Sequence, residues 1–324
     1  MFSFSFKKNK LMFWRRGNSD VATLSRICSA LTDFTATEFV RKVFIKNYSN
    51  FFEENYAKKI INETFFRLTQ SQKPKASIEM LESTLELLSK KIYRNKDNHQ
   101  FFKTYSEYKS SLKPAYYYSV VSQNIIGNKV LDFGSGKGYL SKKFLEHKFT
   151  ITSTDILNYS EVDSKQIPFI KLSSIDNISS RIHEIDTTIA LTVLHHIAEN
   201  QLSTVLRSLS KVTKRLIIIE DIVNPEFFNN EQGSQSFPMN EFLKLSPESR
   251  LNAVIITDFY GNVVTQNLRS MNLPFSFKTM EAWIEILTQN GFTVSSSEEI
   301  GFPKISFHGF YQAKIICDSN QYSE

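Results

Sequence analysis

The sequence predicts an α/β fold in which a doubly wound, mostly parallel sheet follows a helical N-terminal region. Three observations support this prediction. Short apolar runs rich in β-branched residues recur from about residue 129 onwards, helix-length spacers separate them, and they lack the strict alternation of half-exposed strands. Strands of this kind with helices between them are typical of a parallel sheet buried on both faces.

The charge of the chain is distributed unevenly. Residues 1–125 hold 21 Lys and Arg against 11 Asp and Glu, a net charge of +10, whereas residues 126–324 carry −4. The first 19 residues contain no acid and mix aromatic with basic side chains. We expect residues 1–20 to form a basic aromatic tail, which is compatible with a solvated segment, with contact to an anionic membrane surface or nucleic acid, and with a transit peptide.

Helical patterns fill residues 21–112. Thr35 and Glu38 have the spacing of a capping box ahead of an apolar run. An amphipathic helix is predicted where apolar residues recur every three or four positions, at Ile78, Leu81, Leu85, Leu88 and Ile92. A tyrosine cluster follows, placed either to line a lid over the sheet or to pack between domains: Tyr105, Tyr108, Tyr116, Tyr117 and Tyr118.

The α/β domain is expected over residues 113–324, and its first strand, residues 130–133, runs into a glycine loop. The loop, residues 134–138, has glycines at relative positions one, three and five and leads into a helix over about residues 138–147. A dinucleotide-binding loop has its third glycine at position six, where this chain has Tyr139, and a Walker loop ends in a Lys-Ser or Lys-Thr pair that is missing here. The loop therefore predicts a nucleotide-like ligand but fits neither phosphate-binding pattern.

Later strands also end in polar residues. The run over residues 149–156 contains Asp155 about 20 residues beyond the loop, where an acid can accept hydrogen bonds from ribose hydroxyls. The run over residues 186–194 leads into His195 and His196, and the run over residues 216–219 leads into Glu220 and Asp221. Because the carboxyl ends of parallel strands share one edge of a sheet, we expect the ligand site at that edge.

The C-terminal part predicts one helix and two strands. Met280, Trp283, Ile284 and Leu287 share a helical face, and Gly291 follows as a C-terminal cap. Residues 292–294 and 311–317 are expected as strands, the last one antiparallel to its neighbours. The 54 residues from 222 to 275, which precede this helix, are too many for an ordinary connection, and their aromatic content predicts a folded insertion.

Asp132 together with the glycine loop resembles motif I of the class I S-adenosylmethionine-dependent methyltransferases, and the corner at residues 194–197 resembles motif IV of their small-molecule members. The resemblance covers about residues 129–324 apart from the insertion. It implies a seven-stranded, mostly parallel Rossmann-like sheet, methylation as the activity (EC 2.1.1) and S-adenosyl-L-methionine as the cofactor. It also implies that the insertion caps the acceptor pocket, with a structural insertion or a subunit interface as the alternative. The cofactor-binding residues that it implies are Asp132, Gly134, Ser135, Gly136, Gly138, Asp155, Ile156 and Thr192.

Methyl transfer to a hydroxyl or ammonium needs a base, and a histidine that titrates near neutral pH suits this task. We therefore expect His195 and His196 as catalytic residues, with Glu220, Asp221 and His308 as further candidates, while one of the paired histidines can instead be structural. No metal site is expected, because two adjacent histidines are poorly arranged around one ion and the two cysteines are too few for a zinc cluster.

The absence of two motifs from the sequence narrows the class of methyl acceptor. Residues 192–195 do not match the Asn/Asp-Pro-Pro-aromatic motif of amino-methyltransferases, and no acid stands near Thr192 as in ribose 2′-O-methyltransferases. We expect the acceptor to be an O, N or C nucleophile of a small molecule or metabolite, leave a protein acceptor open and do not expect nucleic acid. No run approaches the roughly 18 apolar residues of a membrane span, so a cytoplasmic enzyme is expected. The alternatives are a non-catalytic adenosylmethionine-binding or interaction module and a nicotinamide-dependent oxidoreductase.

Overall fold

The computed structural model describes residues 18–70, 78–93, 99–157, 160–162, 165–172, 178–224, 237–268, 271 and 273–322. Residues 1–17 of the expected basic tail lie outside this set, as do residues 225–236, 269–270 and 272 of the insertion. Within the described residues, no helix is both long enough and apolar enough to span a membrane.

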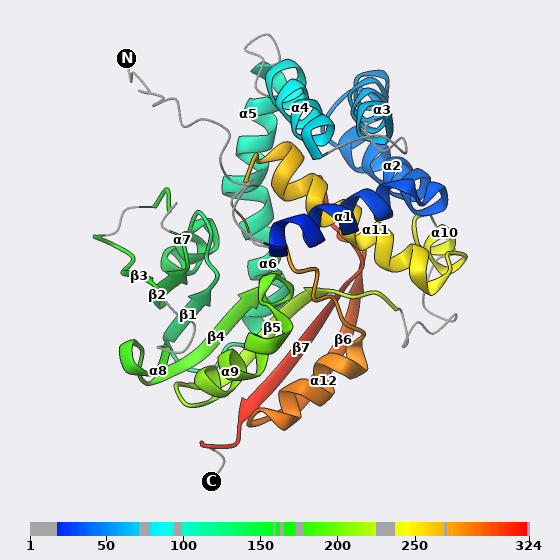
Figure 1. Cartoon of the computed structure of the whole chain (residues 1–324). Coiled ribbons are helices and arrows are strands. Elements are labelled where there is room, and N and C mark those ends of the chain that lie inside the picture. Colours follow the sequence, from blue (N-terminus) through cyan, green and yellow to red (C-terminus); the bar gives the residue numbers. More distant parts are fainter. Residues whose placement is uncertain are drawn as a thin grey trace.

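Seven strands form one sheet in the order β3-β2-β1-β4-β5-β7-β6 (Figure 1). Their bounds are Lys129–Phe133 (β1), Thr150–Asp155 (β2), Phe169–Lys171 (β3), Ile185–Leu191 (β4), Thr213–Asp221 (β5), Phe292–Gly301 (β6) and Gln312–Ser319 (β7). Strands β1 to β5 pair in parallel, and β7 runs antiparallel to both β5 and β6. The predicted doubly wound, seven-stranded and mostly parallel sheet is confirmed.

Helices cover both faces of this sheet. One face packs on α6 (Lys113–Val121) and α7 (Tyr139–Glu146), where Phe144 is fully buried. The other face packs on α8 (Ile178–Arg181), α9 (Glu199–Ser210) and α12 (Met280–Gln289), where Trp283 is fully buried. The β-branched runs of β4 and β5 lie between the two layers, which explains why they do not alternate with polar residues.

The remaining helices gather beyond one end of the sheet (Figure 1). The N-terminal helices are α1 (Asn18–Thr32), α2 (Phe34–Ser49), α3 (Glu54–Gln70), α4 (Ile78–Leu88) and α5 (His99–Glu107). A π-helical turn, η2 (Ser89–Tyr93), extends α4, and a second one, η4 (Tyr108–Leu112), joins α5 to α6. Short 3₁₀ turns follow α6 at η5 (Ser122–Asn124) and β4 at η7 (Leu194–His196).

The insertion contributes a folded part to this helical layer. Its described elements are α10 (Met239–Leu243), α11 (Pro247–Phe259) and the π-helical turn η8 (Tyr260–Thr265). Aromatic rings join it to the N-terminal helices, because Phe39 stacks on Phe242 with ring centroids 5.7 Å apart and Phe44 meets Tyr260 edge-on at 4.8 Å. The N-terminal helices and the insertion therefore share one hydrophobic core.

The amphipathic stripe of α4 and η2 is confirmed, because the described apolar residues that predicted it are buried: Leu81, Leu85, Leu88 and Ile92. The capping box predicted at Thr35 and Glu38 is wrong. Helix α2 begins two residues earlier, with Asp33 as its N-cap, and the Asp33 carboxylate accepts a hydrogen bond from the N–H of Ala36 at 3.0 Å. Glu38 instead pairs with Arg41 one turn along the helix.

Candidate functional site

The glycine loop is fixed against the neighbouring strands. The N–H groups of Gly134 and Ser135 both donate to the carbonyl of Thr154 on β2, at 2.9 Å each. Gly134 adopts a φ of +73°, and a Cβ at this position would lie 2.2 Å from Cγ2 of Val193 beyond β4. Both the positive φ and this overlap exclude a side chain at position 134. Glycine there lets the backbone of the loop pass close to the ends of β1, β2 and β4.

Two buried acids flank the loop. Asp155, at the end of β2, accepts hydrogen bonds from the N–H groups of Gly136 (2.9 Å) and Leu157 (3.2 Å), and burial raises the pKa of its carboxyl. Asp132, on β1, accepts a hydrogen bond of 2.5 Å from the hydroxyl of Ser141 on α7. Burial raises the pKa of Asp132 to about 6 in spite of this hydrogen bond. Both carboxyl groups thus lie beside the loop, and burial makes each of them harder to ionise than an exposed aspartate.

A cavity of about 340 Å³ lies at the carboxyl edge of the sheet, under the helical layer. This volume falls within the range of small-molecule sites. Nine of the ten site residues predicted from the sequence line it: Asp132, Gly134, Ser135, Gly136, Asp155, Ile156, Thr192, His195 and His196. Gly138 does not line the cavity. It starts α7 with a φ of +77°, and a Cβ there would lie 2.6 Å from Cγ2 of Val162.

The corner after β4 is built around a buried carboxylate. Glu220, 1% exposed, accepts hydrogen bonds at Oε1 from the N–H groups of Val193 (2.9 Å) and Leu194 (2.7 Å) and contacts His195 Nδ1 through Oε2 at 2.5 Å. Thr192 precedes this corner with a φ of +46°, a left-handed conformation that is rare for a β-branched residue. Strained backbone of this kind is concentrated at functional sites.

Asp258, which was not predicted from the sequence as a site residue, lies beside His195 and His196. Asp258, in the last turn of α11, places Oδ1 3.6 Å from Nε2 of His195 and 3.6 Å from Nε2 of His196. Burial opposes a charge on His195, but Glu220 and Asp258 outweigh it and raise the pKa of His195 well above its usual value. Burial also opposes the charge of Asp258, yet the two histidines lower the pKa of its carboxyl.

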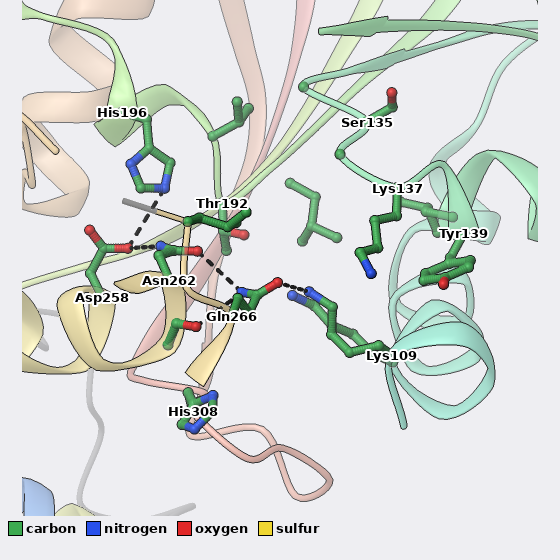
Figure 2. Close-up of a pocket in the computed structure, with 18 of the residues that line it drawn as sticks. Lys109, Ser135, Lys137, Tyr139, Thr192, His196, Asp258, Asn262, Gln266 and His308 are labelled. Carbon is green, nitrogen blue, oxygen red and sulfur yellow. Dashed lines mark hydrogen bonds and ion pairs between the residues drawn. The ribbon is translucent and has the colours of Figure 1, made fainter. Parts of the chain in front are cut away.

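A polar chain continues from this cluster along the cavity wall (Figure 2). Asn262 Nδ2 donates to Asp258 Oδ1 at 2.7 Å, Gln266 Nε2 donates to Asn262 Oδ1 at 3.3 Å, and Lys109 Nζ donates to Gln266 Oε1 at 2.8 Å. These residues come from η4, α11 and η8. Helices whose hydrogen bonding widens to the π pattern are frequent at functional sites.

Lys109 and Lys137 lie at the opposite end of the cavity from His196 (Figure 2). Burial and the charges of Lys113 and Lys137 lower the pKa of Lys109 well below its usual value, and burial lowers the pKa of Lys113. Lys137, whose direction the sequence left open, pairs with Glu161 at 2.6 Å. Neither Lys109 nor Lys113 was singled out from the sequence, although two lysines four residues apart within a tyrosine-rich helical stretch are an available signal.

The three further base candidates, His308, Asp221 and Glu220, differ in their surroundings. Burial and the charges of Lys109 and Lys113 lower the pKa of His308 to about 3, so its imidazole is neutral at physiological pH. Asp221 lines the cavity, where burial raises the pKa of its carboxyl to about 6 and Gln312 Nε2 donates to it at 2.9 Å. Glu220 lies behind the histidines and does not line the cavity.

No protein-family model and no curated protein matches the chain. Among solved structures, a candidate O-methyltransferase from Nostoc punctiforme matches 68% of this chain at 16% identity and a TM-score of 0.45, and the match spans 59% of that protein. The 1,6-didemethyltoxoflavin-N1-methyltransferase of Burkholderia thailandensis, solved with 1,6-didemethyltoxoflavin and S-adenosylhomocysteine, matches 76% of this chain and 92% of its own at 15% identity and a TM-score of 0.42. The methyltransferase domain of bacterial CtHen1-C matches 64% and 96% at 16% identity and a TM-score of 0.41. At these identities and TM-scores, the likenesses assign no activity, substrate or residue role to this chain.

Proposed function

We propose that the chain is an S-adenosylmethionine-dependent methyltransferase. The observation that carries this proposal is the convergence of the glycine loop, Asp132, Asp155 and the Thr192 corner on one cavity at the carboxyl edge of the sheet. These segments are separated in the sequence, and residues from each of them line this cavity.

The donor would lie along the glycine loop. Asp155 is placed to accept hydrogen bonds from the ribose hydroxyls, and Ile156, which is 50% exposed on the cavity wall, offers an apolar surface on which the adenine ring can lie. The methionine part of the donor carries both an ammonium and a carboxylate. Asp132 supplies negative charge for the first and Lys109 supplies a buried amine for the second, and a carboxylate beside this amine would favour its charged form.

Methyl transfer then needs alignment more than covalent catalysis. A lone pair of the acceptor forms a bond to the methyl carbon while the bond from this carbon to sulfur breaks, and the electron pair of the broken bond neutralises the sulfonium. Holding the two reactants in line can supply about 7–11 kcal/mol of the barrier reduction. A hydroxyl or ammonium acceptor also releases a proton, and His196, on the cavity wall, is placed to accept it. Glu220 and Asp258 raise the pKa of His195, which opposes the same role for His195.

A small molecule is the acceptor that we propose. The cavity is roofed by residues of η4, η8 and the segment between β6 and β7, and His308 and Asn262 are among them. Since α11 and η8 belong to the insertion, we propose that residues 222–275 act as the acceptor cap and that residues 21–112 support it. A cavity of this size suits a metabolite better than a folded protein.

Transfer of labelled methyl groups tests this proposal. The purified protein is incubated with S-adenosylmethionine carrying a labelled methyl group and with cell extract, and the small-molecule, protein and nucleic-acid fractions are then counted. We expect label in the small-molecule fraction, with loss of most of the signal in Asp155→Asn. Binding of the donor without transfer to any fraction would instead identify a non-catalytic module.

A further inference from the structure

We propose that His195, His196 and Asp258 bind one divalent transition-metal cation at the histidine end of the cavity. Among the residues that the structure describes, these three each bring a ligand atom to within 4.8 Å of the other two. Two imidazole nitrogens and a carboxylate oxygen are a ligand set suited to zinc, iron, manganese, cobalt or nickel, whereas magnesium and calcium prefer oxygen ligands.

The two distances from Asp258 to the histidines fit a shared cation. Asp258 Oδ1 lies 3.6 Å from Nε2 of His195 and 3.6 Å from Nε2 of His196. A cation about 2.1 Å from two atoms with this separation would subtend an angle of roughly 118° between them, close to a tetrahedral arrangement. The three ligand atoms lie within 4.8 Å of one another, so the two imidazoles would have to approach each other by about an ångström to complete a tetrahedral site.

His195 is held in the orientation of a metal ligand. Its Nδ1 contacts Glu220 Oε2 at 2.5 Å, and Glu220 is itself fixed by the N–H groups of Val193 and Leu194. An imidazole that donates its Nδ1 proton to a carboxylate presents Nε2 on the opposite side of the ring, here towards Asp258, and Nε2 would bind a cation in place of a proton. Metal-binding histidines nearly always have a partner of this kind, and its hydrogen bond strengthens the ligand.

Asp258 carries an unsatisfied oxygen. Its side chain is 5% exposed, and Oδ2 is buried with no hydrogen-bond partner among the described residues. A buried carboxylate oxygen without a donor is costly. Glu220 and Asp221 are buried beside it, so three carboxylates concentrate negative charge around two imidazoles. A dication bound at Oδ1 would balance this charge.

The cluster is open towards the cavity. His195, His196 and Asp258 all line the cavity wall, so a cation with three protein ligands would keep a coordination position for a molecule in the cavity. An acceptor hydroxyl bound there would lose its proton more readily, because a metal ion lowers the pKa of a bound oxygen acid. This consequence rests on the proposed function, whereas metal binding itself does not.

Metal titration tests the inference on the full chain. The protein is stripped with a chelator and dialysed, and Zn²⁺, Mn²⁺ and Co²⁺ are then added separately in a calorimeter, with the visible spectrum of Co²⁺ as a second readout. We expect one equivalent per chain for at least one of these ions, and more than about tenfold weaker binding in His196→Gln and in Asp258→Asn. His183→Gln, at an exposed histidine elsewhere, is the matched control and should bind as the unmodified chain does.

The thermal unfolding of each variant without metal shows whether it folds, and His196→Gln alone carries the comparison if Asp258→Asn does not. Absence of binding for all three ions, or equal binding in His196→Gln and the unmodified chain, would overturn the inference. S-adenosylhomocysteine is titrated into the stripped protein in parallel. Binding of this ligand without metal binding rejects the metal site alone, and metal binding without this ligand rejects the proposed function alone.

Discussion

Asp132 illustrates how a single residue at this site affects stability. Its carboxyl is 2% exposed, and burial raises its pKa to about 6, while the unfolded chain has an ordinary aspartate. Between about pH 4 and pH 6 the folded state therefore binds more protons here than the unfolded state does, so this residue makes the free energy of unfolding fall as the pH rises. Above about pH 6 the loss is complete.

Replacing Asp132 by Asn should remove this dependence. As the pH rises from about 4 to 7, we expect the free energy of unfolding of Asp132→Asn to gain about 2–3 kcal/mol relative to the unmodified chain, because the amide has no charge to bury. Urea unfolding at several pH values measures this difference. Two profiles that stay parallel over the whole range would show that Asp132 ionises normally in the folded protein.

At the scale of single elements, the glycine loop depends on one close approach. Gly134 has a φ of +73° and would place a Cβ 2.2 Å from Val193, whereas Gly301, at the end of β6, has a φ of +77° and its nearest Cβ contact would be 3.9 Å, to Tyr311. Alanine at either position suffers the same backbone strain, but only Gly134→Ala adds an overlap with a stiff side chain.

We expect Gly134→Ala to lose about 1–3 kcal/mol more of the free energy of unfolding than Gly301→Ala, as for other overpacked positions. Chemical denaturation of the two variants compares them directly. Equal losses would mean that the loop can move away from Val193 without cost, and that its path is not fixed by the end of β4.

Elements whose pattern is local could be predicted from the sequence. The loop, the helix after it and strands β1, β2, β4 and β5 follow from continuous apolar runs and from glycine spacing. Strand β3 was not located, because only Phe169–Lys171 pair with β2 and so short a run has no periodicity. The start of α2 was misplaced because an acid at Asp33 and a threonine at Thr35 are equally good caps in sequence, and only the hydrogen bond to Ala36 distinguishes them.

At the scale of the whole molecule, buried hydroxyls join the N-terminal helices to the insertion. The hydroxyls of Tyr93 on η2 and Tyr260 on η8 hydrogen-bond to each other, and Thr64 on α3 contacts Tyr93 at 3.2 Å. Both tyrosines are buried, at 1% and 0% exposure. The network lies between parts of the chain that are far apart in sequence, so it should stabilise the helical layer above the cavity.

A double-mutant cycle tests this network. Tyr93→Phe and Tyr260→Phe should each cost about 1–3 kcal/mol of the free energy of unfolding, because each leaves the other hydroxyl buried with fewer partners. The double variant should cost less than the sum of the two. Strict additivity in denaturant unfolding would show that the hydroxyls do not act together.

The part of the site that the sequence missed is also a whole-molecule property. Residues at the carboxyl ends of parallel strands must lie at one edge of the sheet. The sequence alone therefore predicted that the residues proposed to bind the methyl donor lie close together. Asp258, Asn262 and Lys109 reach the cavity from helices outside the sheet, and no local pattern fixes how those helices dock. The metal site that we propose could not be expected from the sequence for the same reason, since its third ligand comes from α11.

Calorimetric titration of S-adenosylhomocysteine into the full chain tests the central claim most directly. We predict one binding site per chain, with at least about tenfold weaker binding in Asp155→Asn, because a charge-assisted hydrogen bond to ribose contributes about 1.5–3 kcal/mol. Asp318→Asn, whose carboxylate pairs with Arg215 on β5, is the matched control and should bind normally. No binding of S-adenosylhomocysteine or S-adenosylmethionine, together with binding of NADH, would contradict the assignment of a methyl-donor site.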